Sequence, residues 1–137
     1  MQIIISKQRG VVILENMIAI LIFSMGILGI VGLLGASMKS AAGAKYRNDA
    51  SLLANQIIGQ MWVADKTNAS LKTKFESPSG AAFVVWKNAV TSALPGVAAN
   101  PPTIAIDANN VATVTVLWQL PGEAAAHNFV VSARVNN

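Results

Sequence analysis

The chain has 137 residues and a net charge of +4, and 53% of its residues are hydrophobic whereas only 12% are charged. A composition this apolar excludes an intrinsically disordered chain and is unusual for a freely soluble domain, so we expect part of the protein to lie in lipid or against a partner. The absence of cysteine excludes disulfide bonds, thiolate zinc sites and cysteine nucleophiles.

The first predicted element is an apolar helix over residues 11–38, which we expect to cross a membrane. No charged residue occurs between Glu15 and Lys39. At about 1.5 Å per helical residue this uncharged segment is about 35 Å long, and a hydrocarbon core is about 30 Å thick. Lys7 and Arg9 precede the segment and favour a cytoplasmic N-terminus, although the basic residues that follow it weaken this signal.

Glu15 is an unusual residue for such a segment. It lies four residues after Val11, where the apolar stretch begins. An unpaired carboxylate would cost on the order of 2.5–3.5 kcal/mol at mid-membrane and less near the edge. We therefore expect a cationic partner for Glu15, unless this residue only marks the membrane edge.

Glycine recurs at every third position in the same segment. A spacing of three places these residues in a spiral around a helix rather than on one face. They either permit close packing against several neighbours or mark a segment that unwinds readily, although glycine is also common in membrane helices generally. The four residues are Gly26, Gly29, Gly32 and Gly35.

Residues 7–22 resemble the leader and the N-terminus of type IV pilins and pseudopilins. The basic string over residues 7–10 ends in glycine, as the leaders of that family do, and glutamate is the fifth residue after it. One departure is Val11, a position where Phe or Met is more common in the family. The segments that are similar to PilV-type minor pilins are residues 22–33, 86–96 and 115–119.

This resemblance implies that a prepilin peptidase removes residues 1–10 by cutting between Gly10 and Val11, and that the new amino group of Val11 is N-methylated. An α-amino group has a pKa of about 8 and is largely charged at neutral pH, so it can compensate Glu15 of the same or of an adjacent subunit. The resemblance implies the adjacent subunit, where the pair sets the register of a helix bundle. Removal of a secretory leader near residues 36–44 is a rival route, but it would need an apolar region longer than the usual length of about 7–15 residues.

Residues 39–66 are predicted to continue the helix as an amphipathic stalk. We expect an extracytoplasmic head, residues 67–137, to cover its apolar stripe. Within the head, residues 67–80 are predicted to be a loop, because Asn, Ser, Pro and Gly cluster there. The residues of the stripe recur at steps of three and four and are Tyr46, Ala50, Leu53, Ile57, Met61 and Ala64.

The rest of the head is predicted to contain one short helix and three strands. Apolar residues at helical spacing, followed by Pro95 and Gly96, predict a helix over residues 81–94, with a strand over residues 83–86 as the alternative. The fold class is therefore α+β, with the long N-terminal helix packed against a small antiparallel sheet, as in the pilins that the chain resembles. Alternating apolar and polar residues predict the strands at about 103–107, 111–120 and 128–135.

The sequence contains no catalytic motif. His127 is the only histidine and is predicted to lie in a surface loop, so a transition-metal site is not expected. The six acidic residues are scattered, and no nucleophile elbow, phosphate loop or dinucleotide fingerprint occurs. The basic residues after the leader are mixed with acidic ones, so we expect no nucleic-acid partner. We expect no enzymatic activity and no cofactor, and we assign Trp62, Trp86 and Trp118 to the core.

The resemblance implies a PilV-like minor pilin, which helps to initiate and build a type IV pilus within a tip complex. Its implied partners are the prepilin peptidase, other minor pilins, the major pilin, the inner-membrane assembly platform and, before assembly, membrane lipid. The implied location is the bacterial inner membrane, with one pass and a periplasmic head, and then the pilus at the cell surface. Two alternatives stay open: a minor pseudopilin of a type II secretion system, and a pilin for DNA uptake or adhesion.

Overall fold

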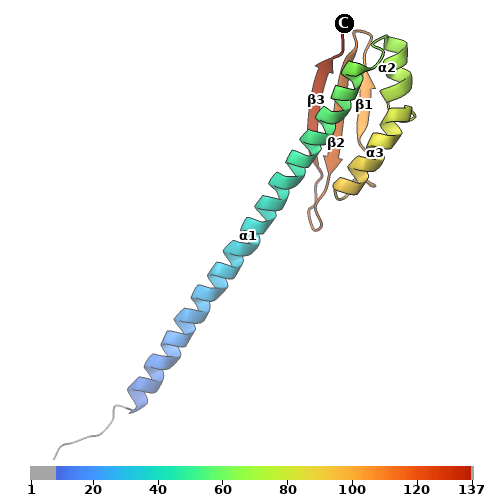
Figure 1. Ribbon diagram of the computed structural model, residues 1–137. Helices are drawn as coiled ribbons and strands as arrows, with labels where there is room; N and C mark the ends of the chain where they lie inside the picture. The colour runs from blue at the N-terminus through green and yellow to red at the C-terminus, as the bar shows by residue number, and fades with distance from the viewer. Residues whose placement is uncertain (1–8, 137) are drawn as a thin grey trace, which may run out of the picture. The chain divides into compact units, whose positions relative to one another are not determined.

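The computed structural model describes residues 9–136 and confirms the predicted α+β layout, with a long N-terminal apolar helix and a small antiparallel sheet (Figure 1). The chain divides into two compact units at Ala41 and Ala42, which are described separately below. The elements in chain order are α1 (Arg9–Val63), α2 (Asn68–Phe75), α3 (Ala81–Ala93), β1 (Thr103–Ile106), β2 (Val111–Trp118) and β3 (His127–Arg134).

Helix α1 begins at Arg9, so Arg9 and Gly10, which were predicted to end the leader, are part of the helix. No proline interrupts the chain before Pro78, and the helix therefore runs to Val63 without a break. It ends slightly earlier than the predicted residue 66. The reason lies at Asp65, whose carboxylate accepts hydrogen bonds from the backbone N–H of Thr67 at 3.0 Å and from its hydroxyl at 3.2 Å and so favours a turn.

The three strands form one sheet in the order β1-β2-β3, and both pairs are antiparallel. The turn between β1 and β2 is held by Asp107, whose Oδ1 accepts hydrogen bonds from the N–H groups of Val111 and Asn109, each at 2.8 Å. The hydrogen bond from Val111, followed by that from Asn109, holds the pKa of Asp107 below its ordinary value. The next residue of the turn, Asn110, has a positive φ of 59°, which asparagine tolerates well.

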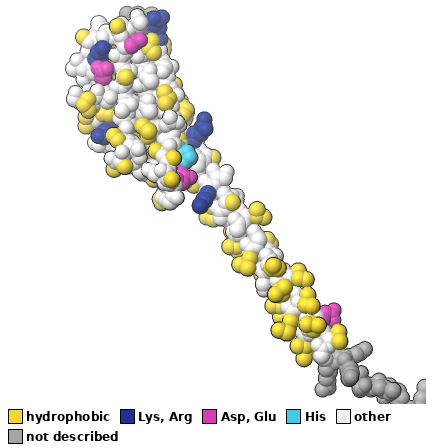
Figure 2. All heavy atoms as spheres, turned by 180° about the vertical axis from the view of Figure 1, so that it is seen from behind, with side chains coloured by type: hydrophobic (Ala, Val, Ile, Leu, Met, Phe, Trp, Pro, Cys, Tyr) yellow, Lys and Arg dark blue, Asp and Glu magenta, His cyan; other side chains and the backbone are white. Residues whose placement is uncertain are grey.

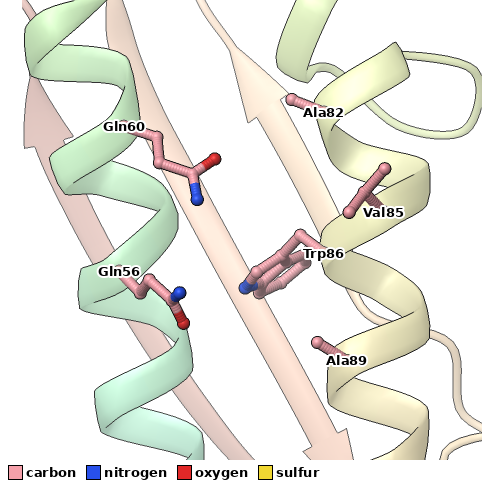
Figure 3. A pocket seen from close by; sticks show the side chains of 6 residues that line it. All are labelled: Gln56, Gln60, Ala82, Val85, Trp86 and Ala89. Atoms are coloured by element: carbon pink, nitrogen blue, oxygen red, sulfur yellow. The ribbon is translucent and has the colours of Figure 1, made fainter.

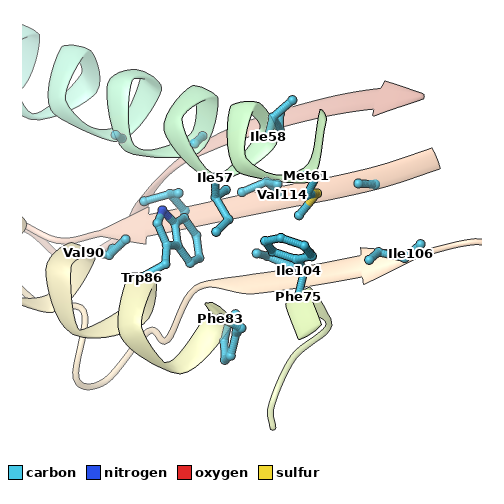
Figure 4. Packing of buried hydrophobic residues seen from close by; sticks show 14 of the residues in the cluster. Ile57, Ile58, Met61, Phe75, Phe83, Trp86, Val90, Ile104, Ile106 and Val114 are labelled. Atoms are coloured by element: carbon cyan, nitrogen blue, oxygen red, sulfur yellow. The ribbon is translucent and has the colours of Figure 1, made fainter. Parts of the chain in front are cut away.

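The core of the head lies between the C-terminal part of α1, the two short helices and one face of the sheet (Figure 4). The predicted stripe on α1 is confirmed: Ala50, Ile57 and Met61 are fully buried, and its other three members pack against the core while partly exposed. The sheet alternates as predicted, since every second residue of β1 and β2 is buried. The buried residues of these two strands are Ile104, Ile106, Ala112, Val114, Val116 and Trp118.

The prediction of a loop over residues 67–80 was wrong for its first part, which forms α2. This two-turn helix buries Leu71 and Phe75, which lie one helical turn apart, and its other residues are polar or small. A stripe of only two residues does not stand out in a sequence, and Thr67 before the helix makes no side-chain capping hydrogen bond. We therefore attribute the stability of helix α2 to the burial of Leu71 and Phe75 in the core.

The remaining elements occupy the segments expected for them, with small differences at their ends. Helix α3 covers residues 81–93, so the alternative strand over 83–86 does not form. Strand β2 ends at Trp118 instead of residue 120, because the N–H of Gln119 leaves the sheet and donates to the carbonyl of Pro95 at 3.0 Å.

Gly96 and Gly122 allow a prediction with a built-in control, because both have a positive φ, of 72° and 84°. A Cβ at Gly96 would lie 2.8 Å from the carbonyl oxygen of Gln119, whereas a Cβ at Gly122 meets no atom within 4 Å. Gly122→Ala should lower the free energy of unfolding by about 1–2 kcal/mol through the left-handed backbone alone. Gly96→Ala should lower it further through the clash, and equal losses in urea unfolding of the two full-length variants would contradict this account.

Candidate functional site: the apolar surface of helix α1

The N-terminal part of α1 presents apolar side chains on all its sides. Every residue from Gly10 to Ala41 is exposed, and its large apolar side chains are 45–73% exposed (Figure 2). The helix is long and apolar enough to cross a membrane, and none of its most apolar window is buried in the described part of the chain. A helix that is apolar all round needs lipid or other helices around it.

Glu15 lies on this apolar surface and is exposed. Among the side chains described, those of residues 10–136, the only ion pair joins Glu123 and His127, so Glu15 has no ionic partner within this range. Another polar residue of the segment, Ser24, donates its hydroxyl proton to the carbonyl of Ile20 at 2.7 Å and is thus satisfied by the helix itself. Glu15 is therefore a charged group on the apolar surface that no side chain of residues 10–136 compensates.

The four glycines expected to serve helix packing have open space around them. A Cβ added at any of them meets no atom within 4 Å, and the same holds at Gly10. No contact within the described chain therefore requires glycine at these positions. The lack of side chains leaves shallow places where another backbone can approach α1 closely. These positions are Gly26, Gly29, Gly32 and Gly35.

A groove of about 290 Å³ lies in the head between α1 and α3 (Figure 3). Gln56 and Gln60 of α1 face Trp86 of α3 across it. The indole N–H of Trp86 donates to the carbonyl of Leu53 at 2.8 Å, which fixes α3 to α1. The lining contains amide, apolar and small side chains and offers no acid, base or nucleophile.

The prediction that all three tryptophans lie in the core was wrong for one of them. Trp86 and Trp118 are buried, with 4% and 3% of their surface exposed, but Trp62 is 47% exposed. Trp62 follows the buried Met61 directly, so it points about 100° away from the stripe. Its ring lies 5.9 Å from Nζ of Lys66, which is the distance of a cation–π contact.

The prediction that His127 lies in a loop was wrong, because His127 is the first residue of β3. Its ring stacks on Trp118 with 5.7 Å between the centroids, and its Nε2 lies 2.7 Å from Oε2 of Glu123. Register explains the placement, since Trp118 and His127 are partners at the end of the ladder between β2 and β3. Across residues 9–136, no cluster of three or more His, Asp or Glu residues could hold a metal ion.

The predicted processing site is seen only in part. Lys7 lies outside the described residues, whereas Gly10 and Val11 lie in the first turn of α1, and Val11 is exposed.

Family models, curated proteins and solved structures were compared with the chain, and none of them matches it. The candidate site therefore rests on its own physical features, which are an exposed apolar helix, one uncompensated acid near its start and four unfilled glycine positions.

Proposed function

We propose that the protein is a minor pilin, which is held in the bacterial inner membrane by α1 and then joins a type IV pilus through the same helix. The observation that carries this proposal is Glu15, one acid on an otherwise apolar and exposed helix surface, placed five residues after a basic string that ends in Gly10. A plain anchor has no need of a charge at this position, and the charge is unfavourable there. A subunit that must align with its neighbours does need a charge at this position, because the charge can pair with a cation of the adjacent subunit.

In this proposal, cleavage between Gly10 and Val11 creates the cation that Glu15 lacks. The new amino group of Val11, N-methylated or not, is charged at neutral pH and pairs with the corresponding glutamate of an adjacent subunit, and Glu15 pairs in the same way with the N-terminal amino group of a neighbour. Pairing is favourable only when the two helices are in the correct axial register, because a carboxylate in an apolar surrounding is strongly unfavourable unless a cation meets it. Glu15 therefore serves as a register device.

The apolar surface of α1 supports the exchange of lipid for other helices. Lipid and a bundle of apolar helices solvate such a surface about equally well, so close packing decides between them. The open glycine positions from Gly26 to Gly35 allow neighbouring backbones to approach. The head, whose core includes the C-terminal part of α1, would then face other minor pilins and the major pilin.

The proposal is tested by the mass of the processed protein. Co-expression of the full chain with an active prepilin peptidase should yield a membrane-extracted protein that begins at Val11, with or without one added methyl group. Cells without the peptidase provide the control and should retain residues 1–10. A mature N-terminus at any other residue in the presence of the peptidase would remove the cation next to Glu15 and would refute the proposal.

A further inference from the structure

Strand β3 is a border of the sheet and pairs only with β2 (Figure 1). The opposite border, β1, is only four residues long and is closed by the segment after α2. There the N–H of Ser77 donates to the carbonyl of Ile104 at 3.0 Å, and the N–H of Ile106 donates to Oε1 of Glu76 at 3.3 Å. The fold therefore closes one sheet border and leaves the longer one, with eight residues, open.

The backbone groups on the open border can be identified from the ladder. The N–H of Val135 donates to the carbonyl of Asn110 at 2.9 Å, which fixes the residues of β3 that bond to β2 as those at odd positions. The residues at even positions direct their N–H and C=O groups away from β2. Outside the ladder, no backbone hydrogen bond to them occurs within residues 9–136. These residues are Asn128, Val130, Ser132 and Arg134.

An open groove of about 350 Å³ lies in the head between α1 and β3. Phe129, which is only half-buried, belongs to its lining, and the helix contributes small and polar residues and one cation, Arg47. Val131 and Ala133 are also only partly covered on this face of β3. A strand added beside β3 would lie under α1 at this place and would complete the cover of these apolar side chains.

We propose that β3 accepts an extended segment of another polypeptide as a fourth strand, and that this segment carries an acidic side chain beside an apolar one. The unpaired backbone groups select an extended segment, Phe129 selects an apolar side chain, and Arg47 selects an acid. No acidic residue lines the groove, and β3 itself contains none. A second copy of this strand would therefore bring no charge that complements Arg47, which favours a different polypeptide. This surface is a property of the head and is independent of the proposed register role of Glu15.

The test uses the full chain in detergent micelles and a synthetic eight-residue peptide in which threonine alternates with valine or glutamate, so that valine and glutamate share one face. Amide hydrogen exchange measured by NMR gives the decisive readout. On binding, the amides of Asn128, Val130, Ser132 and Arg134 should gain protection, whereas those at the odd positions of β3 are already protected by β2. A peptide that only fills the groove would not produce this alternation, and that result would overturn the proposal.

Two pairs of variants separate the backbone contact from the charge contact. Val130→Pro removes an outward N–H without breaking the ladder to β2, and it should weaken peptide binding at least about fivefold, whereas Val130→Thr should not. Arg47→Glu should weaken binding of the glutamate peptide about fivefold and favour the same peptide made with lysine. Lys45→Glu is the matched control, because Lys45 is also exposed on α1 but lies outside the groove.

Three further results would overturn the inference. The first is the absence of binding by either peptide at millimolar concentration. The second is equal binding of the glutamate and lysine peptides by the unaltered protein, which would remove the role of Arg47. The third is self-association of the protein that Val130→Pro abolishes, since the occupant of the border would then be a second copy of β3.

Discussion

Replacing Glu15 with alanine should leave the protein in the membrane and prevent its entry into the assembled filament. Insertion should persist or improve, because the substitution removes the only charged side chain of the apolar segment. Assembly should fail, because the N-terminal amino group of a neighbouring pilin would then be buried without a partner. The loss of one member of a buried charge pair costs about 3–5 kcal/mol, which is more than a hundredfold in an equilibrium constant.

The measurement compares the amount of the variant in sheared filaments with the amount in the membrane fraction. Asn16→Ala is the matched control, since Asn16 is the adjacent polar residue, is also exposed and carries no charge. It should be incorporated like the unaltered protein. Glu15→Gln keeps the shape of the side chain and should fail as Glu15→Ala does. Equal incorporation of Glu15→Ala and the unaltered subunit would show that the charge has no role in alignment.

The second large effect is expected in the head, where Trp86→Ala should lower the free energy of unfolding by about 3–5 kcal/mol. Trp86 is 4% exposed and fills the space between α3 and α1, and its indole N–H bonds to the carbonyl of Leu53. The substitution removes both the buried ring and the hydrogen bond. Loss of this size is a large fraction of the stability of a small domain, so part of the purified variant should be unfolded at room temperature.

Two further substitutions separate the causes of this loss. Trp86→Phe keeps an aromatic ring and loses the indole N–H, so it should cost much less than the alanine variant. Trp62→Ala removes an equally large side chain from a half-exposed position and should change the free energy of unfolding by less than about 1 kcal/mol. Urea unfolding followed by circular dichroism measures all three variants. A similar loss for Trp62→Ala and Trp86→Ala would contradict the assignment of Trp86 as the residue that joins the helices.

Sequence periodicity was sufficient to predict an element and its buried face where the element is long enough to repeat its pattern of apolar residues. The stripe from Tyr46 to Ala64 spans several helical turns, and the alternation in β2 continues over eight residues. Both patterns therefore indicated their element and its buried face. The extent of the apolar segment and the position of Glu15 were equally readable, because charge and hydropathy are properties of the sequence itself.

The features that were missed depend on contacts between segments far apart in the chain. Helix α2 is too short to repeat a pattern and is fixed by the burial of Leu71 and Phe75. The place of His127 follows from its register opposite Trp118 in the ladder. The open border of β3 could not be predicted either, because strand order and the closure of β1 by Ser77 exist only in the folded chain.

The burial of Val135 has a consequence for the synthesis of the protein. This residue follows the last strand, β3, and is completely buried, and it shares the core with Ala50 and Met61, which leave the ribosome much earlier. The core around the apolar face of the helix can therefore be completed only after β3 and Val135 have been translated. A stop codon placed before β3 would leave this core incomplete, and proteases should clear such a product while they spare the chain that contains β3.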